Sequence, residues 1–383
     1  MNKNVLILGA STRAAAQSAR RAGLIPWTAD LFADLDLSQI SITTKIENYP
    51  DDFLALAKQR QQDCAFWLYT GGLENWPRLV DQISRHVELL GNAGSVLRRV
   101  RDPFLLSQYW RENGFLAPAV QQTSDGLPRD GSWLCKPRRS AGGIRIHPLT
   151  NACELDRTSS YLQQRINGQA FAANYVAGAT GCRLLGVTEQ LTGIPWTGAR
   201  EFQYAGSIGP LQLKPLQWDL LNDMGEAISR QFSLQGLFGI DMVLSDNEVW
   251  PIEVNPRYTA SLEILERALN IQALTIHVEA CLNGNGSVAN VHLYEPDSSV
   301  HGKVILFSPG TYRVDKNLVT YLSDQRTVFP KFADIPANQT LIRQGQPVCT
   351  IFAEGKDREQ VIQQLKCLVK EVLKQLLLCN SKQ

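Results

Sequence analysis

The sequence predicts an α/β unit followed by an α+β unit, and three observations lead to this fold class. A continuous apolar run, Val5–Leu8, ends at a glycine and precedes an alanine-rich stretch, which is typical of a buried parallel strand leading into a helix. Two apolar segments joined by Ser245-Asp246-Asn247 indicate an antiparallel hairpin. The chain of 383 residues is long enough for two or three packed units.

The first 95 residues predict a small, doubly wound, Rossmann-like unit. Ser11 and Thr12 can cap a helix that runs to Ala22 and is closed by Gly23. Strands are predicted at Val5–Leu8, Leu24–Asp30 and Cys64–Tyr69. Because strands that alternate with helices form parallel sheets, we expect residues 1–95 to form one.

Residues 96–290 predict an α+β unit that is rich in antiparallel strands. A helix is predicted over Leu216–Phe232, and the Gly284–Ser287 stretch punctuates the chain near the end of the unit. Short apolar segments predict strands at Ser132–Lys136, Gly143–His147, Tyr161–Ile166, Ala170–Val176, Leu184–Glu189, Gly236–Leu244 and Glu248–Val254.

Residues 291–383 predict a small strand-rich domain with a terminal helix. Strands are expected over Gly302–Ala353, and a long helix over Asp357–Cys379. The apolar residues of this helix recur with the 3.6-residue period of an amphipathic helix. We therefore expect it to cover the core of its own domain rather than a membrane surface.

Composition and charge exclude several classes of protein. The 38 Lys and Arg residues nearly balance the 37 Asp and Glu residues, so no excess of positive charge is present to bind nucleic acid. No apolar run approaches the roughly 20 residues that span a bilayer. The eight irregularly spaced cysteines and the five scattered histidines make a poor zinc ligand set. We expect the cysteines to be free thiols, as is typical of proteins in a reducing cytoplasm.

A candidate metal site lies on the predicted hairpin. If Asp246-Asn247 form the turn, Asp241 and Glu253 lie opposite each other on adjacent strands. Side chains alternate between the faces of a strand, so Glu253, Asn255 and Arg257 share one face. Oxygen ligands of this kind suit Mg²⁺ that is shared with substrate phosphates. A half-buried hairpin with a polar solvent face is the alternative, although facing carboxylates repel each other without a cation between them.

A second candidate site precedes the hairpin in the chain. Lys136 stands at the end of a predicted strand, before a short loop that contains Ser140, Gly142 and Gly143. Such loops allow backbone N–H groups to approach phosphate oxygens, while a lysine balances the phosphate charge. A β-hairpin with a basic tip is an equally good explanation of these residues.

The order of the two sites resembles the ATP-grasp superfamily, and the resemblance covers about residues 98–260. The run Glu253-Val-Asn255-Pro-Arg257 is similar to the family's metal motif, and Asp241 is similar to its first metal carboxylate. The resemblance implies an ATP-grasp fold with an N-terminal pre-domain. It also implies that ATP binds with Mg²⁺, or alternatively Mn²⁺, at Asp241, Glu253 and Asn255. Arg257 corresponds to the arginine that stabilises the reacting centre.

The same resemblance assigns residues to the nucleotide. Those that it assigns to the phosphates are Lys136, Ser140, Gly142 and Gly143, and those that it assigns to the adenine are Gln163, Gln164 and the backbone of Ile166. The family's earlier lysine is replaced here by a group of arginines, Arg98, Arg99 and Arg101, of which we predict Arg101 as the nucleotide contact. The family's ribose-binding glutamate falls near Ala170, whose side chain cannot accept a hydrogen bond.

The family's chemistry implies an ATP-dependent ligase that joins a carboxylate to an amine through an acyl phosphate, with Lys136 and Arg257 as catalytic residues. Two alternatives remain, namely an ATP-dependent carboxylase that uses bicarbonate and a nucleotide-binding subunit that has lost catalysis. The implied partners are a small carboxylate and a small amine, and the relatives imply a homodimer. Resemblance to a carboligase-like group suggests biosynthesis of a one-carbon cofactor of the methanopterin or methanofuran type.

Two turns of the N-terminal unit are candidates for the border of the acceptor crevice. Gly9–Arg13 and Thr70–Asn75 each follow a predicted strand, and an anion could rest on the helix N-terminus after the first of them. Plain strand–helix turns, which occur throughout α/β folds, are the alternative.

Overall fold

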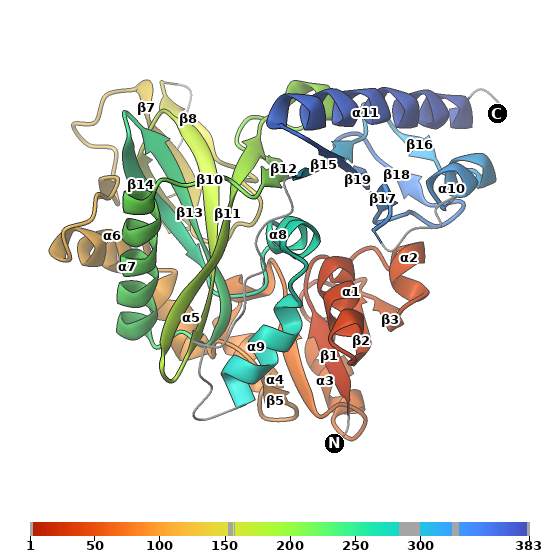
Figure 1. Cartoon of the computed structure of the whole chain (residues 1–383), viewed down its shortest axis with the longest axis horizontal. Helices are drawn as coiled ribbons and strands as arrows, with labels where there is room; N and C mark the ends of the chain where they lie inside the picture. Colours follow the sequence, from red (N-terminus) through yellow and green to blue (C-terminus); the bar gives the residue numbers. More distant parts are fainter. Residues whose placement is uncertain (1–2, 152–155, 157, 283–298, 324–328, 381–383) are drawn as a thin grey trace.

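The computed structural model describes residues 3–151, 156, 158–282, 299–323 and 329–380 (Figure 1). The predicted break at Gly284–Ser287 lies outside these residues. Within the described residues, a five-stranded parallel sheet precedes antiparallel sheets of eight, four and two strands. This arrangement confirms the predicted fold class.

The N-terminal sheet is parallel and has the strand order β3-β2-β1-β4-β5. Its strands are β1 (Asn4–Leu8), β2 (Ile25–Asp30), β3 (Ile42–Lys45), β4 (Phe66–Tyr69) and β5 (Glu88–Leu89). The helices of this part are α1 (Arg13–Arg21), α2 (Leu35–Ser38), α3 (Asp52–Arg60), η1 (Leu73–Asn75), α4 (Pro77–Ile83) and α5 (Gly94–Val100). Val5 and Ile7 pack into one core, and Leu6 and Leu8 into another, which explains why the strand is apolar throughout.

The carboxyl ends of β1 and β4 lie side by side, because Leu8 pairs with Tyr69. The turns that follow the two strands therefore meet at one edge of the sheet. Gly9 is needed at this meeting point, since a Cβ there would overlap the Thr70 hydroxyl.

The eight-stranded sheet has the order β14-β13-β10-β11-β12-β15-β19-β17. Its strands are β10 (Gln169–Gly178), β11 (Gly181–Thr192), β12 (Tyr204–Gly209), β13 (Gly236–Ser245), β14 (Glu248–Asn255), β15 (Val300–Phe307), β17 (Phe332–Ala333) and β19 (Pro347–Gly355). Helix α7 (Pro215–Phe232) packs against it through Leu221, Met224 and Ile228. Helices α8 (Leu262–Leu269) and α9 (Ala273–Leu282) fill the space between this sheet and the N-terminal sheet (Figure 1).

A small sheet, β6-β9-β7-β8, stands beside the large one. It follows helix α6 (Pro103–Glu112), and its strands are β6 (Val120–Gln121), β7 (Asp130–Pro137), β8 (His147–Thr150) and β9 (Ser160–Gln164). The predicted strand at Gly143–His147 is wrong, because the strand begins only at His147. Gly142, Gly143 and Arg145 have φ angles of 63°, 74° and 64°, and this left-handed backbone forms a turn rather than an extended strand.

The C-terminal part adds strands and a long helix to the large sheet. It contains α10 (Lys316–Ser323), the two-stranded sheet of β16 (Tyr312–Arg313) and β18 (Leu341–Ile342), and α11 (Arg358–Asn380). The predicted amphipathic helix is confirmed, since Val361, Leu365 and Val372 of α11 are fully buried. No helix in the described part of the chain combines the length and the apolar character needed to cross a bilayer.

We retain the division into residues 1–95, 96–290 and 291–383 as a proposal for the domain boundaries. Apolar cores within the three parts support it, although a further core joins the first two parts, since Val5 and Ile7 pack in one cluster with Val176 and Leu265. The large sheet continues from β12 into β15, so the second and third units share one sheet.

Candidate active site

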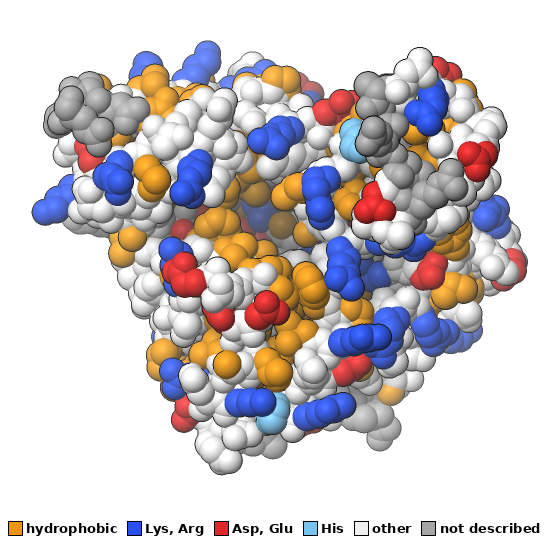
Figure 2. All heavy atoms as spheres, turned by 180° about the vertical axis from the view of Figure 1, so that it is seen from behind, with side chains coloured by type: hydrophobic (Ala, Val, Ile, Leu, Met, Phe, Trp, Pro, Cys, Tyr) orange, Lys and Arg blue, Asp and Glu red, His pale blue; other side chains and the backbone are white. Residues whose placement is uncertain are grey.

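One large cavity, of about 680 Å³, lies where the N-terminal turns, the small sheet and the large sheet meet. Figure 2 shows the molecule hollowed between its upper and lower parts. Cavities of a few hundred to about a thousand Å³ commonly hold small ligands in proteins. All of the residues that the sequence assigned to the site line this cavity: Arg101, Lys136, Ser140, Gly142, Gly143, Gln163, Gln164, Ile166, Asp241, Glu253, Asn255 and Arg257.

The hairpin of β13 and β14 brings the two predicted metal carboxylates together. Asp241 and Glu253 are direct cross-strand partners, as the sequence predicted. Asp246 and Asn247 form the turn with positive φ angles of 49° and 67°, which fixes the register of the two strands. A slip of one residue would turn both carboxylates away from the cavity.

The carboxylates differ in their charge environment. Burial and the nearby charge of Glu253 raise the pKa of Asp241 to about 7. Burial alone would raise the pKa of Glu253, but the charges of Lys136 and Arg101 outweigh it and lower that pKa. Two facing acids in a buried site therefore depend on positive charge around them.

Amide side chains complete the surroundings of the carboxylates. Gln190 donates a hydrogen bond to Asp241 Oδ1 at 2.6 Å, and Asn255 Nδ2 donates one to Asp241 Oδ2 at 2.9 Å. Within the described ranges, no cluster of three or more His, Cys, Asp or Glu side chains is placed to hold a metal ion. A cation here would take the oxygens of Asp241, Glu253 and Asn255 and complete its shell with phosphate oxygens, a set that fits Mg²⁺.

Lys136 lies on β7 and points toward the carboxylates. It is 6% exposed, and its Nζ donates a hydrogen bond to Gln163 Oε1 at 3.0 Å. Burial lowers the pKa of Lys136, but the groups around it, Tyr161, Glu253 and Asp241, raise the pKa above its usual value overall. The ammonium group therefore keeps its charge beside the hairpin.

The structure distinguishes among the three arginines that stand in the place of the earlier lysine. Arg101 lines the cavity and donates hydrogen bonds to Asn75 Oδ1 at 3.2 Å and to the Ser140 carbonyl at 3.4 Å. Arg98 pairs with Asp81 on the surface, and Arg99 lies over the ring of Phe232. Asp102 caps helix α6, which fixes the direction of the chain directly after Arg101.

The glycine-containing loop lies against the loop before β12. The backbone N–H of Tyr204 donates a hydrogen bond to the Gly142 carbonyl at 3.0 Å. A Cβ on Gly143 would overlap the Phe202 carbonyl oxygen, so only glycine permits this approach. Ser140 closes the loop internally through a hydrogen bond from its hydroxyl to the Ile144 carbonyl at 2.8 Å.

The predicted adenine segment also borders the cavity, but its amide side chains are engaged within the protein. Gln163 accepts the bond from Lys136, and Gln164 Oε1 accepts a hydrogen bond from the Ala119 N–H at 3.2 Å. Ala170 lines the same cavity without a polar side chain, at the place of the family's ribose contact.

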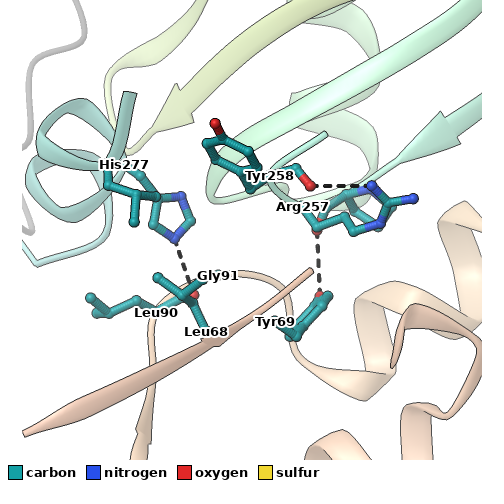
Figure 3. A pocket seen from close by; sticks show the side chains of 9 residues that line it. Leu68, Tyr69, Leu90, Gly91, Arg257, Tyr258 and His277 are labelled. Atoms are coloured by element: carbon teal, nitrogen blue, oxygen red, sulfur yellow. Dashed lines mark hydrogen bonds between the residues drawn. The ribbon is translucent and has the colours of Figure 1, made fainter. Parts of the chain in front are cut away.

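Arg257 connects the hairpin to the N-terminal unit. Its Nη2 donates to Asn255 Oδ1 at 3.2 Å, and its Nε donates to Glu74 Oε1 at 2.8 Å. Burial lowers the pKa of Arg257, whereas the charge of Glu74 and the hairpin carboxylates raise it above its usual value. A second cavity, only about 10 Å³ in volume, lies behind Arg257 and is bordered by Tyr69, Tyr258 and His277 (Figure 3).

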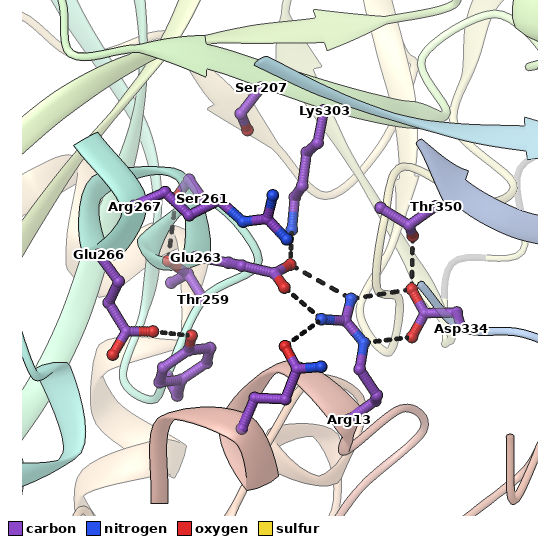
Figure 4. A network of polar contacts seen from close by, with 12 residues as sticks. Arg13, Ser207, Thr259, Ser261, Glu263, Glu266, Arg267, Lys303, Asp334 and Thr350 are labelled. Atoms are coloured by element: carbon purple, nitrogen blue, oxygen red, sulfur yellow. Dashed lines mark hydrogen bonds and ion pairs between the residues drawn. The ribbon is translucent and has the colours of Figure 1, made fainter. Parts of the chain in front are cut away.

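Sequence reasoning missed the far wall of the large cavity. Lys303 on β15, Thr350 on β19 and Asp334 after β17 line it together with Arg13 and Ser261 (Figure 4). The Gly9–Arg13 turn borders the cavity through Ala10, Ser11 and Arg13. Within it, the Arg13 guanidinium is bonded to Gln17, Glu263 and Asp334. No local pattern joins these residues, which come from distant parts of the chain.

Comparisons with known proteins support the fold. The family model described as ATP-grasp domain matches residues 100–261. An uncharacterized protein of Methanocaldococcus jannaschii is 21% identical over 376 residues, which cover 92% of this chain and 88% of that protein.

Three solved structures align with nearly the whole chain. N5-carboxyaminoimidazole ribonucleotide synthetase from Thermotoga maritima has a TM-score of 0.65 at 14% identity, and the alignment covers 96% of this chain and 98% of that one. L-amino acid ligase from Bacillus licheniformis has a TM-score of 0.69 at 15% identity, with 97% of each chain covered. The biotin carboxylase domain of 2-oxoglutarate carboxylase from Hydrogenobacter thermophilus has a TM-score of 0.68 at 10% identity, with 95% and 88% covered.

At these identities the solved structures establish the fold, and the family match covers the residues that form the cavity's hairpin, lysine strand and glycine loop. Residues 100–261 therefore match the ATP-grasp domain, and the chain as a whole has the fold of the three solved structures described above.

Proposed function

We propose that this protein is an ATP-dependent ligase that joins a carboxylate to an amine through an acyl phosphate and releases ADP and phosphate. One observation carries the proposal. A single cavity gathers a buried lysine, two facing carboxylates and an arginine whose side chain is 12% exposed, namely Lys136, Asp241, Glu253 and Arg257. The names of two structural neighbours, a synthetase and an L-amino acid ligase, support this class of reaction.

The barrier to the first step is electrostatic, because an anionic carboxylate must approach an anionic triphosphate. Lys136 and Arg257 hold positive charge near the paired carboxylates and lower this barrier. Mg²⁺ bound by Asp241, Glu253 and Asn255 would neutralise and orient the phosphate oxygens. A carboxylate oxygen then bonds to the γ-phosphorus while the bond from that phosphorus to the ADP oxygen breaks.

The second step replaces phosphate by an amine. The amine nitrogen attacks the acyl carbon, loses a proton, and expels phosphate through a tetrahedral oxyanion. Arg257 is the proposed partner of that oxyanion, because its guanidinium reaches Asn255 at the edge of the metal site. No protein nucleophile takes part in this sequence.

A carboxylase that uses bicarbonate is the second candidate. It is favoured by the structural likeness to a biotin carboxylase domain that was solved with magnesium ADP and bicarbonate. ADP release measured with acid and amine pairs, with and without bicarbonate, separates the two reactions. A subunit that only binds nucleotide would release no ADP under any of these conditions, but the presence of Arg257 in the cavity argues against that alternative.

The proposal includes three finer elements. They are a role in making a one-carbon cofactor of the methanopterin or methanofuran type, a homodimeric state and a location in the cytoplasm. The resemblance to carboligase-like proteins supports the first, and the wider ATP-grasp relatives support the second. The seven described cysteines, all free thiols, support the third.

The substitution Glu253→Gln tests the metal assignment. We expect it to abolish Mg²⁺-dependent binding of an ATP analogue, measured by calorimetry, while circular dichroism shows an intact fold. Glu248→Gln, an exposed change on the same strand, is the matched control and should bind as the wild type does. Wild-type binding by the Glu253→Gln protein would contradict the proposed function.

A further inference from the structure

The connection after β4 touches the candidate active site from the N-terminal unit. Asn75 accepts a hydrogen bond from Arg101 and donates one to the Ser140 carbonyl at 3.1 Å. The Arg139 guanidinium lies over the ring of Trp76, 4.7 Å from its centre. One short segment, Thr70–Trp76, therefore contacts a cavity arginine and the glycine-containing loop.

Glu74 is the member of this segment that reaches Arg257. Its Oε1 lies 2.8 Å from both Nε and Nη2 of Arg257, and its side chain is almost fully buried. The other oxygen, Oε2, is buried without a hydrogen-bond partner in the described structure. Among the described residues, the Glu74 carboxylate thus bonds to Arg257 alone. It makes no hydrogen bond within its own loop, so holding that loop together does not explain why a carboxylate is buried here.

Arg257 in turn touches the metal-site residues. Its Nη2 donates to Asn255, which itself donates to Asp241. On the other side, the guanidinium lies against the backbone of Gly71, where an added Cβ would stand 3.4 Å from it. The N-terminal segment therefore holds the guanidinium from two directions.

We propose that Glu74 is a positioning residue that fixes the Arg257 guanidinium at the phosphate end of the cavity. The proposal rests on the proposed function, which places Arg257 beside the reacting phosphoryl group. Glu74 itself does not line the cavity, so it acts through Arg257 rather than on a ligand. Through this pair the N-terminal unit, whose turns already line the cavity, also holds an arginine of the hairpin.

The physical reason is the geometry of the guanidinium. A carboxylate bound at Nε and Nη2 fixes the rotation of the planar group, while Nη1 donates to the Tyr258 carbonyl at 3.1 Å. Without that partner the long side chain regains rotamer freedom, and a displacement of about 1 Å at a reacting centre can cost ~100-fold.

The test measures phosphate binding in a product-like complex. Inorganic phosphate is titrated by calorimetry into the full-length protein saturated with magnesium ADP, using wild type, Glu74→Gln, Arg257→Ala and the double variant. We expect Glu74→Gln to weaken phosphate binding about 10-fold, as for loss of a charged hydrogen bond, and to leave the Kd for magnesium ADP within about 2-fold. The double variant should bind phosphate no more weakly than Arg257→Ala, because Glu74 acts through Arg257.

Several outcomes would overturn the proposal. One is that Glu74→Gln weakens phosphate binding and magnesium ADP binding equally. Another is that Glu74→Gln weakens phosphate binding as much in the Arg257→Ala protein as in the wild type. A third is that the wild type does not bind phosphate. Failure of the wild type to bind magnesium ADP would instead overturn the proposed function itself. A wild type that binds both ligands, with Glu74→Gln unchanged, removes only the role of Glu74.

A matched control separates positioning from stability. Glu266 is also fully buried and pairs with Arg21 at 2.7 Å between α8 and α1, outside the cavity. Glu266→Gln should lower stability and leave phosphate binding unchanged. If Glu74→Gln does not fold, Glu74→Asp keeps the charge while shortening the side chain, and should weaken phosphate binding without affecting magnesium ADP.

Discussion

His277 is a buried histidine that must remain neutral in the folded protein. Its Nδ1 accepts a hydrogen bond from the Leu237 N–H at 2.9 Å, and its Nε2 donates one to the Leu90 carbonyl at 3.2 Å (Figure 3). Burial lowers the pKa of His277 from 6.5 to about 4. The ring joins α9 both to the large sheet and to the N-terminal unit, so its protonation state affects both contacts.

Because the His277 ring is neutral when folded, we predict that the protein loses stability in mild acid. The unfolded chain binds a proton on His277 below about pH 6.5, whereas the folded chain does not until about pH 4. Stability from the neutral ring is therefore complete above pH 6.5 and falls with decreasing pH, by on the order of 3 kcal/mol across the window. Urea unfolding from pH 7 to pH 5 measures the slope.

The matched variant for this prediction is His277→Gln. Its amide can accept from Leu237 and donate to Leu90 but has no proton to gain, so the slope between pH 7 and pH 5 should become shallower. An unchanged slope would show that other groups govern the acid response.

Arg257 is predicted to act on turnover more than on nucleotide affinity. Removing one group that stabilises a developing negative charge typically costs about 100-fold in turnover. We expect Arg257→Ala to reduce ADP release by about that factor and to change the affinity for magnesium ADP by less than about 3-fold. Arg98→Ala, which removes a surface arginine paired with Asp81, is the control. Equal losses of turnover and of magnesium ADP affinity would show that Arg257 serves nucleotide binding rather than the chemical step.

At the scale of elements, the glycine-containing loop offers a matched pair of substitutions. Gly142 and Gly143 both have positive φ angles, so a side chain strains the backbone at either position. An added Cβ meets nothing within 4 Å at Gly142, but at Gly143 it overlaps the Phe202 carbonyl. Alanine at Gly142 therefore tests backbone strain alone, whereas alanine at Gly143 tests strain together with a clash against the loop before β12.

We therefore expect Gly143→Ala to weaken binding of a magnesium ATP analogue more than Gly142→Ala does. The difference should be about 10-fold, since the clash pushes the loop away from Phe202 and from the cavity that both residues line. Calorimetric titration of both variants checks it. Equal affinities would mean that contact with Phe202 does not hold the loop over the nucleotide.

The elements also show where local patterns succeed and fail. The hairpin of β13 and β14 was predictable because Asp246-Asn247 is a turn signal and a period of two fixes which side chains share a face. The segment Gly143–His147 was not, because its apolar alternation resembles a strand while its backbone is left-handed at Gly143 and Arg145. Contact with Phe202 and Tyr204, about 60 residues away, is what holds that turn.

At the scale of the whole molecule, Arg13 joins three parts of the chain. It lies at the start of α1 and bonds to Glu263 on α8 and to Asp334 after β17 (Figure 4). Lys303 on β15 binds the same Glu263 at 2.9 Å. Glu263 is buried, and the charges of Arg13 and Lys303 overcome the effect of burial and lower its pKa.

This network predicts that Arg13 is important for global stability. Arg13→Met keeps most of the buried volume but leaves Asp334 without its guanidinium partner and removes one of the two cations that are hydrogen-bonded to Glu263. Breaking a buried ion pair in this way typically costs about 3–5 kcal/mol. We expect a loss of about 3 kcal/mol in the free energy of unfolding, measured with urea.

Lys45→Met is the control, because Lys45 and its partner Glu47 are both exposed and such pairs contribute little. A loss below about 1 kcal/mol for Arg13→Met would mean that apolar packing, rather than this network, holds the three parts together.

The sequence by itself determined the fold class and the pairing of the two carboxylates. Each of these depends on features that are local in the chain, namely hydrophobic periodicity, turn residues and the position of a side chain along a strand. Family resemblance then supplied the nucleotide residues, and the structure brings all of them to one cavity.

The prediction of Arg101 agrees with its place in the cavity, whereas only the tertiary structure shows that Glu74 lies close to the cavity and that Lys303 and Thr350 line it. Contacts such as Glu74 with Arg257 join residues that are far apart in sequence, through sheets whose relative placement depends on the packing of buried side chains. Hydrophobic packing depends on volume and shape rather than on any short pattern, so a linear sequence does not show which distant side chains it brings together.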